Sequence, residues 1–297
     1  MKLLVTGSLQ ATPEELERLR SIGHEVTLHQ WEKDPVECPE QYEGVICNGL
    51  FLYNPIENFT SLRYIQLTSA GYDRVPMDFV QAHGIEIHNA RGVYSVPMAE
   101  FALCGVLQLY KESRFFYESQ KARLWEKHRG LRELCGKTVC IVGCGSVGTE
   151  CALRFRAFGC RVVGVDLCPR SAEPYEEMVG LDALDAKLRT ADVVVLTLPL
   201  TAQTHHLMNK ERLSLLKPEC VLVNIARGAV VDTEALAERL PNLGGAVLDV
   251  FETEPLPPES PLWDAPNVIL TPHNSFVGEG NHDRLMNAVI GNLECYE

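Results

Sequence analysis

The stretch CIVGCGSVGTECALRFRAFG, residues 140–159, decides the fold. It begins as an apolar strand, passes through Gly143, Gly145 and Gly148 in the spacing G-x-G-x-x-G, and continues as a helix. In a dinucleotide-binding turn, the first glycine permits the tight turn, the second lets the backbone approach a pyrophosphate, and the third allows close packing of helix on strand. The pyrophosphate then lies at the positive end of the helix dipole, among free N–H groups. The alternative is a turn whose glycines are purely structural.

The next strand strengthens the dinucleotide interpretation. RVVGVD, residues 161–166, ends in Asp166, which follows Gly148 by 18 residues. This is close to the ~20 residues expected before an acidic residue that accepts hydrogen bonds from the adenosine ribose. A carboxylate there would repel the 2′-phosphate of NADP, so the sequence favours NAD as the cofactor over NADP, although the nearby Arg170 weakens that preference.

Short apolar strands alternate with helices along the whole chain, which predicts an α/β fold with parallel sheets covered by helices. The expected strands are KLLVTG, EVTLH, GVICNG, RYIQLTS, IEIHNA, TVCIVG, RVVGVD, DVVVLTLP, CVLVNIA, GAVLDVF and VILTPH. The first helix is expected to have Thr12 as its N-cap, Pro13 at its first position and Gly23 as its stop.

A chain of 297 residues is long for one hydrophobic core, so we expect two domains. Residues 1–95 are expected to form a substrate-binding domain, which the C-terminal helix within 276–297 completes. Residues 96–275 are expected to form the NAD-binding domain.

The charge balance excludes several classes of partner. Lys and Arg number 27 against 40 Asp and Glu, a net charge of −13, which argues against nucleic acid and against anionic membrane surfaces. It does not exclude a small anionic substrate, because a few cations dominate one pocket. No apolar run reaches the ~18–20 residues of a membrane helix.

Cysteine and histidine usage favours a reduced, cytoplasmic protein without a metal. The eleven cysteines contain no C-x-x-C pair. His205 and His206 are adjacent and therefore point in different directions, so we expect no shared metal.

One long helix is predicted from Ser95 to about Trp125. It is apolar on more than one face, so it is either central or pressed against another subunit. We favour a homodimer, because soluble oligomers are usually symmetric.

Three successive strands of the second half end in polar groups. CVLVNIA leads to Arg227, GAVLDVF leads to Asp249 and Glu254, and VILTP leads to His273. Because the carboxyl ends of parallel strands share one edge of the sheet, these groups are expected to meet beside the dinucleotide site.

The residue types suit reduction of a 2-keto acid. A guanidinium binds carboxylate and carbonyl oxygens in a two-pronged geometry that lysine does not match. Histidine donates a proton to the forming alkoxide, and a neighbouring carboxylate orients the imidazole ring. Taken singly, Arg227 could be a surface ion pair, Glu254 a solvated turn residue and His273 a helix cap. Their convergence at one edge favours the catalytic interpretation.

The motifs GCGSVG, LTLPLTAQTHHLMN, VNIARGAVVDTEAL, LDVFETEPLP and ILTPH resemble those of the D-isomer-specific 2-hydroxyacid dehydrogenases, in order and spacing. SAGYDRV and ARGVYSVPMAE in the first half resemble that family's substrate loop and hinge. The resemblance covers nearly the whole chain. It implies two Rossmann- or flavodoxin-like doubly wound domains, with the active site in the cleft between them.

By that resemblance Arg227, Glu254 and His273 form the catalytic trio, with Arg227 as substrate clamp, His273 as acid–base and Glu254 as its orienting carboxylate. The resemblance also implies that Ala70 and Gly71 bind the substrate carboxylate through their backbone N–H groups, and that the helix containing Met98 joins a homodimer. The cofactor contacts that it implies, together with the glycine turn, are Gly143, Gly145, Ser146, Val147, Gly148, Asp166, Pro199, Thr204, Ala226 and Asp249.

The chain departs from the family pattern at two places. Asn274-Ser275-Phe276 replaces a small, glycine-rich stretch, and Arg91 stands where a proline or another neutral residue is common. Arg91 either recognises a second anionic group or forms a salt bridge, which we favour.

The leading hypothesis is an NAD-dependent dehydrogenase that reduces a small 2-keto acid to the D-2-hydroxy acid. The alternatives are an NAD-responsive binding or corepressor module on the same fold, or another NAD-dependent reaction such as formate oxidation.

Overall fold

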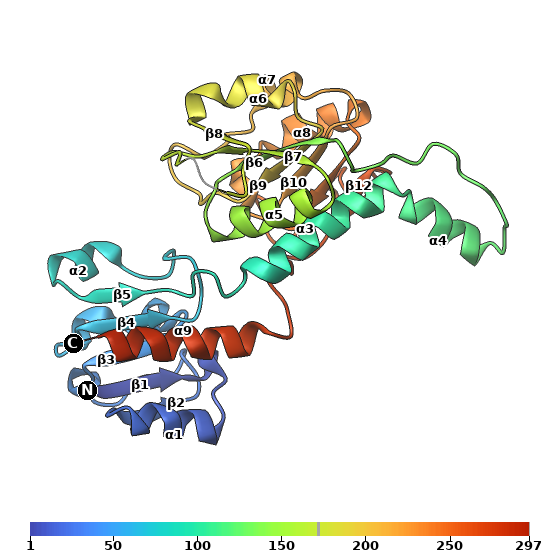
Figure 1. Ribbon diagram of the computed structural model, residues 1–297. Helices are drawn as coiled ribbons and strands as arrows, with labels where there is room; N and C mark the ends of the chain where they lie inside the picture. Colours follow the sequence, from blue (N-terminus) through green and yellow to red (C-terminus); the bar gives the residue numbers. More distant parts are fainter. Residues whose placement is uncertain (171–172, 297) are drawn as a thin grey trace. The chain divides into compact units, whose positions relative to one another are not determined.

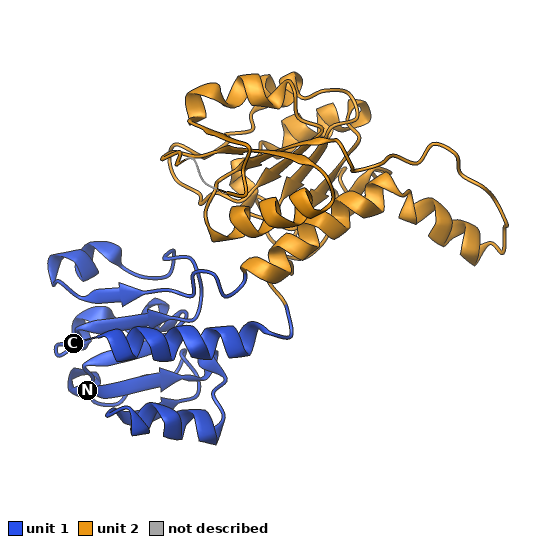
Figure 2. Cartoon of the chain, viewed as in Figure 1, with its two compact units in different colours: residues 1–94, 278–297 blue, residues 95–277 orange. Residues whose placement is uncertain are grey.

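The computed structural model describes residues 1–170 and 173–296. Glu297, the last residue of the segment expected to complete the first domain, lies outside the described residues, as do residues 171 and 172. The chain divides into two compact units: residues 1–94 with 278–297, and residues 95–277 (Figure 2).

The first unit is built on a parallel five-stranded sheet of order β2-β1-β3-β4-β5 (Figure 1). Its strands are β1 Lys2–Thr6, β2 Glu25–His29, β3 Gly44–Cys47, β4 Tyr64–Leu67 and β5 Glu86–His88, and its helices are α1 Pro13–Ser21, α2 Met77–Ala82 and α9 Asn281–Cys295. The five strands expected in this part of the sequence are therefore confirmed.

Helix α1 begins as the sequence predicts. Thr12 is its N-cap, and the hydroxyl of Thr12 accepts from the N–H of Glu15 while the Glu15 carboxylate accepts from the N–H of Thr12. Pro13 occupies the first helical position, and Gly23 follows the helix with a φ of +94°, a conformation that favours glycine.

Both faces of the first sheet are buried. Leu3 and Val5 face one core, and Leu4 between them faces the other, as the alternation of a strand requires. The C-terminal helix α9 covers the first of these faces (Figure 1). Its contribution is an apolar stripe, Leu285, Met286, Val289, Ile290 and Leu293.

The second unit contains a parallel seven-stranded sheet of order β12-β11-β10-β9-β6-β7-β8. The strands are β6 Thr138–Val142, β7 Arg161–Val165, β8 Glu177–Val179, β9 Val193–Leu196, β10 Val221–Asn224, β11 Gly245–Leu248 and β12 Val268–Leu270. The helices are α3 Ser95–Tyr110, α4 Ser113–Lys121, α5 Ser146–Ala157, α6 Leu184–Leu188, α7 Lys210–Leu215 and α8 Thr233–Arg239.

The two parallel sheets confirm the predicted α/β class. All six strands expected in the second half are present, and strand β10 is buried on both faces, with Leu222 in one core and Val221 and Val223 in the other. Sequence analysis missed β8. It is a three-residue edge strand, too short to show a pattern.

The prediction of one helix from Ser95 to about Trp125 is wrong. Helix α3 ends at Tyr110, α4 begins at Ser113, and Glu112 between them has a left-handed φ of +50°. The chain that returns from α4 ends helix α3. The N–H of Arg132 donates to the Tyr110 carbonyl oxygen, which would accept a hydrogen bond within the helix if α3 continued. The Arg132 guanidinium also lies over the Tyr110 ring, 4.2 Å from its centroid.

Helix α3 packs directly on the sheet. A Cβ on Gly105 would lie 2.6 Å from a methyl group of Val247 in β11, so only glycine allows this approach. Among the described residues, no helix combines the length and apolar character that crossing a bilayer requires.

Candidate active site

The glycine turn between β6 and α5 has the geometry that its three glycines predict. Gly143 has a φ of +99°, and a Cβ on Gly148 would lie 2.1 Å from the carbonyl oxygen of Gly143. A Cβ on Gly145 would meet nothing within 4 Å. The open side of the turn therefore lies at Gly145, the N-cap of α5, where no side chain caps the helix. This opening fits a pyrophosphate at a helix N-terminus. Ser146 and Val147 form the first turn of α5 and are partly exposed.

Asp166 lies directly after β7 and holds the turn from the neighbouring strand. One carboxylate oxygen accepts from the N–H of Cys144 at 2.7 Å, and the other accepts from the N–H of Cys168 at 3.0 Å. The pKa of the Cys144 thiol is raised to about 11 by burial, so this cysteine stays protonated at neutral pH. The site thus presents one fixed carboxylate and no thiolate from Cys144.

The order of the sheet brings the three candidate catalytic side chains to one edge. Strands β10, β11 and β12 are neighbours, and Arg227, Glu254 and His273 follow their carboxyl ends. Backbone hydrogen bonds continue past the strands, from Asp249 N–H to the Asn224 oxygen and from His273 N–H to the Asp249 oxygen at 2.8 Å. The three loops therefore leave the sheet side by side.

Asn224, the last residue of β10, shapes the loop that bears Arg227. Its buried side chain accepts from the N–H of Ala226 and donates to the carbonyl oxygen of Arg227 at 3.0 Å. The Arg227 guanidinium donates to the Ala226 carbonyl oxygen at 2.8 Å. Ala226 itself is 6% exposed.

Gly228 is required by the neighbouring loop. A Cβ at this position would lie 1.8 Å from the carbonyl carbon of Phe251 and 2.4 Å from the nitrogen of Glu252. The loop after β10 therefore lies directly against the backbone of the loop after β11.

Glu254 and His273 are in contact. The Nδ1 atom of His273 lies 2.9 Å from a carboxylate oxygen of Glu254, whose other oxygen accepts from the N–H of Phe251. Because a carboxylate accepts hydrogen bonds, Nδ1 is the donor and Nε2 is left for proton transfer. The side chains are 38% and 44% exposed, so both are accessible to a small molecule.

Comparison with known proteins identifies the family. The model of the D-isomer specific 2-hydroxyacid dehydrogenase, NAD binding domain, matches residues 103–275. A glyoxylate reductase of Korarchaeum cryptofilum is 33% identical over 300 residues, which cover 94% of this chain and 89% of the relative. A glyoxylate reductase of Pyrococcus horikoshii is 34% identical over 256 residues, covering 81% and 75%. The chain belongs to the D-isomer specific 2-hydroxyacid dehydrogenase family.

Solved structures of this family share the fold along the chain. A family protein from Aeromonas salmonicida is 31% identical, with a TM-score of 0.80 over 98% of this chain and 94% of the other. A D-isomer specific 2-hydroxyacid dehydrogenase from Xanthobacter autotrophicus Py2, in complex with NADPH and MES, is 29% identical, with a TM-score of 0.77 over 97% and 95%. This chain is therefore an NAD(P)-binding oxidoreductase of the dehydrogenase family.

Like Asp166, two further expected cofactor contacts, Asp249 and Thr204, have structural partners of their own in this dehydrogenase. Asp249 is fully buried, and its carboxylate accepts from the Thr271 hydroxyl and from the N–H groups of Asn274 and Ser275. Thr204 is 1% exposed, and its hydroxyl donates to the carbonyl oxygen of Pro199 at 2.7 Å. Contact of these residues with the cofactor stays a prediction.

The expected substrate loop of the dehydrogenase lies in the first unit, after β4. The Asn89 side chain donates to the carbonyl oxygen of Ala70 at 2.6 Å and accepts from the N–H of Arg91 at 3.1 Å. Arg91 is exposed, and the choice between a second anionic group and a salt bridge as its partner stays a prediction. The role of Ala70 and Gly71 in binding substrate stays a prediction.

Sequence reasoning missed Asn224 and named Asp249 only as a strand-end polar group and a cofactor contact, not as a residue that holds a loop. Asn224 and Asp249 fix the loops that carry Arg227 and His273, and a polar residue at the end of an apolar strand was the available signal. Glu252 and His206 are a further pair, with 2.6 Å between carboxylate oxygen and Nε2. They lie 46 residues apart, and no local pattern links them.

Proposed function

We propose that this dehydrogenase transfers hydride between NADH and a small 2-keto acid, giving the D-2-hydroxy acid. The observation that carries the proposal is the hydrogen bond of 2.9 Å between Glu254 and Nδ1 of His273, at the sheet edge where Arg227 also emerges. A carboxylate, an imidazole and a guanidinium at one edge supply the orienting, proton-transferring and anion-binding groups that this reaction needs.

The glycine turn supports dinucleotide binding by this chain. The open side of the turn at Gly145 would leave room for a pyrophosphate at the start of α5, and Asp166 would accept hydrogen bonds from the adenosine ribose hydroxyls. The reduced nicotinamide supplies the hydride when the cofactor is bound. Asp166 favours NAD, because its carboxylate would repel a 2′-phosphate.

Arg227 is proposed to clamp the substrate. Its guanidinium would bind a carboxylate and a carbonyl oxygen together and would stabilise the negative charge that grows on the carbonyl oxygen. The backbone N–H groups of Ala70 and Gly71 would hold the substrate carboxylate, as the family resemblance implies.

His273 is proposed to move the proton. With Nδ1 bound to Glu254, its Nε2–H would be donated to the oxygen that becomes the hydroxyl of the product, and Nε2 would accept that proton in the reverse direction. Glu254 would keep the ring oriented and stabilise the imidazolium form.

The substrate proposed first is glyoxylate, because relatives that match most of the chain bear the name glyoxylate reductase. The test is oxidation of NADH, followed at saturating cofactor, with glyoxylate, pyruvate, hydroxypyruvate, 2-ketoisocaproate and 3-phosphohydroxypyruvate, and reduction of NAD with formate. Turnover with a 2-keto acid is expected. Tight NADH binding without turnover of any 2-keto acid would instead support a binding or corepressor module, and turnover of formate alone would support formate oxidation.

The cofactor preference is tested at Asp166. We expect Asp166→Ala to reduce the ratio of kcat/KM for NADH to kcat/KM for NADPH, because the charge that repels the 2′-phosphate is lost. Arg170→Ala is the matched variant and is expected to raise the ratio. An unchanged ratio in Asp166→Ala would mean that NAD selectivity arises elsewhere.

The two units would divide the work, with residues 1–94 and 278–297 binding substrate and residues 95–277 binding NAD. This chemistry is expected in the cytoplasm, where thiols such as the eleven cysteines stay reduced.

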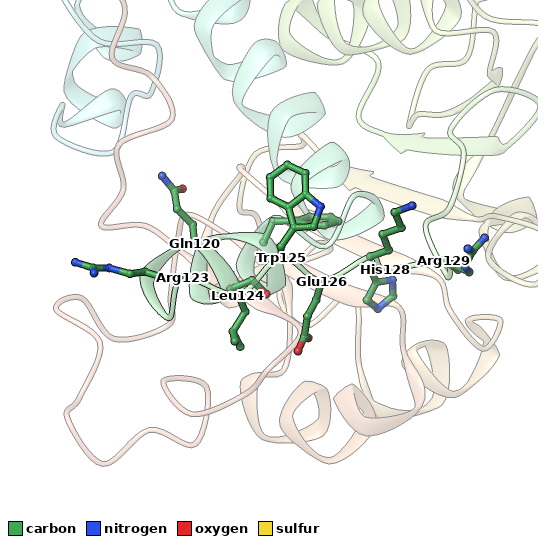
Figure 3. Close-up of a pocket in the computed structure, with 10 residues that line it drawn as sticks. Gln120, Arg123, Leu124, Trp125, Glu126, His128 and Arg129 are labelled. Atoms are coloured by element: carbon green, nitrogen blue, oxygen red, sulfur yellow. The ribbon is translucent and has the colours of Figure 1, made fainter.

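A homodimer joined through α3 and the segment after it is also proposed. Helix α4 and the chain that follows extend away from the rest of the second unit (Figure 1). An open hollow of about 740 Å³ lies there, with the labelled side chains coming from the end of α4 and the chain beyond it (Figure 3). Its lining residues are Phe116, Ser119, Gln120 and residues 123–129. Trp125 is 97% exposed and Leu124 is 52% exposed. A second copy of the chain would bury this apolar surface.

A further inference from the structure

The loops that carry Arg227 and Glu254 are linked by a pair of side chains outside the candidate trio. Glu252 lies in the loop after β11, two residues before Glu254. One of its carboxylate oxygens lies 2.6 Å from Nε2 of His206, and the other accepts from the N–H of Thr233 at 2.9 Å. Thr233 is the first residue of α8, so the carboxylate also lies at a helix N-terminus.

His206 reaches the other loop through its backbone. Its N–H donates to the carbonyl oxygen of Ala229 at 2.8 Å, and the N–H of Met208 donates to the carbonyl oxygen of Val230 at 3.0 Å. Residues 228–230 form the turn that directly follows Arg227. His206 therefore holds the loop after β10 with its backbone and the loop after β11 with its ring.

The backbone of His206 has a strained conformation, which its contacts hold in place. Its φ is +46°, in the left-handed region that is unfavourable for a non-glycine residue. Such a conformation persists only where the surrounding contacts over-determine it. In this chain those contacts are the hydrogen bonds to Glu252 and Ala229.

The charge state of Glu252 agrees with this geometry. Burial raises the pKa of the Glu252 carboxyl. The hydrogen bonds from Thr233 and His206 lower the pKa by more than burial raises it, so the pKa lies below the ordinary value. The carboxylate is therefore ionised at neutral pH and accepts from both partners.

A metal site does not explain the cluster. The rings of His205 and His206 are stacked, with centroids 4.1 Å apart, and only His206 contacts Glu252. Within residues 1–170 and 173–296, no group of three His, Cys, Asp or Glu side chains is arranged to hold a metal ion.

We propose that Glu252 and His206 form a bridge that sets the position of Arg227 relative to Glu254, and that both are positioning residues for the 2-keto acid reaction. This inference rests on the proposed function. The loops are already in backbone contact at Gly228, where no Cβ fits against Phe251 and Glu252. The bridge adds a second, polar connection between the same two loops.

Loss of the bridge is expected to affect catalysis more than cofactor binding. A displacement near 1 Å of a catalytic group costs on the order of 100-fold in rate. Glu252→Ala is therefore expected to lower kcat/KM for the 2-keto acid by about 10- to 100-fold, with KM raised through Arg227 and kcat lowered through Glu254. The dissociation constant of NADH, measured by fluorescence, is expected to change less than twofold.

Conservative and matched variants separate positioning from general destabilisation. Glu252→Gln keeps a side-chain acceptor for Thr233 and a polar group facing His206, so it should retain most of the activity. His206→Asn tolerates the left-handed backbone but has a shorter side chain, and should resemble Glu252→Ala. The two losses should not add in the double variant.

Two controls stand close to the bridge. Glu238→Ala removes a carboxylate from the exposed Lys210–Glu238 ion pair of α7 and α8, and His205→Ala removes the neighbouring ring. Both should keep kcat/KM within twofold. Retention of full kcat/KM in Glu252→Ala, or equal losses in the bridge variants and these controls, overturns the proposal.

Hydrogen exchange tests the bridge without any turnover. In Glu252→Ala and His206→Asn, amide exchange measured by mass spectrometry should rise in peptides covering residues 226–232 and 250–256, and should stay unchanged in Glu238→Ala. If the wild-type protein reduces no 2-keto acid, the proposed function fails while this measurement still decides the bridge. Unchanged exchange in both peptides of Glu252→Ala would contradict it.

Discussion

At His273 the backbone and the side chain are held by different partners. Its N–H donates to the Asp249 carbonyl oxygen, its φ is +51°, and its Nδ1 atom is bound to Glu254. The buried Asp249 carboxylate fixes the residues on either side of His273. The Glu254 carboxylate therefore orients the imidazole, while the Asp249 carboxylate fixes the loop that carries His273.

This arrangement predicts a large effect of replacing the ring. His273→Ala is expected to lower kcat for the 2-keto acid by roughly two to four orders of magnitude, the usual contribution of a general acid–base group. NADH should still bind, because the glycine turn is untouched. Stopped-flow measurement of a single turnover checks this, with Trp263→Phe as a surface control. Near-wild-type kcat at neutral pH would remove His273 from the mechanism.

At the scale of elements, the contact between the loop after β10 and the loop after β11 requires a glycine at position 228. The structure places Gly228 where a Cβ would collide with the Phe251 carbonyl group. Glycine is required because a side chain at this position would not fit between the two loops.

Gly228→Ala therefore tests the loop contact. The Cβ would force backbone atoms apart, so the free energy of unfolding should fall by at least the roughly 1–3 kcal/mol typical of overpacking. The activity should fall with it, because the loops of Arg227 and Glu254 both move. Gly291→Ala in α9 is the matched control, since its Cβ meets nothing within 4 Å, and it should gain about 0.5–1 kcal/mol from lower backbone entropy. Urea unfolding measures both changes. Equal stabilities of the two variants would contradict the contact.

The break between α3 and α4 also depends on a contact between elements. Residues 95–125 look like one helix because their composition stays helical across Lys111 and Glu112. Helix α3 ends because Arg132, some 20 residues further on, donates to its terminal carbonyl oxygen. A distant partner ends this helix, and local propensity does not reveal it.

At the scale of the whole molecule, the exposed apolar side chains after α3 predict assembly. The double variant Leu124→Ser, Trp125→Ser is expected to shift a dimer toward monomer, because it removes apolar area that a second copy would bury. Sedimentation velocity over a range of concentrations measures the shift. Trp31→Ser in the first unit, also exposed at 66%, is the control and should leave the dimer intact. A wild-type protein that is monomeric at every concentration would end the dimer proposal.

The sequence alone determines the two parallel sheets, the glycine turn and the shared edge of Arg227, Glu254 and His273. These follow from local rules: apolar runs buried on both faces become parallel strands, and the carboxyl ends of such strands share one edge. Only the tertiary structure decides which polar side chains hold those three residues. Asp249 and the Glu252–His206 bridge act across neighbouring loops that are distant in the chain, whereas Asn224 holds its own loop from the end of β10. Such contacts depend on strand order and loop packing, and hydrophobic periodicity carries no information about them.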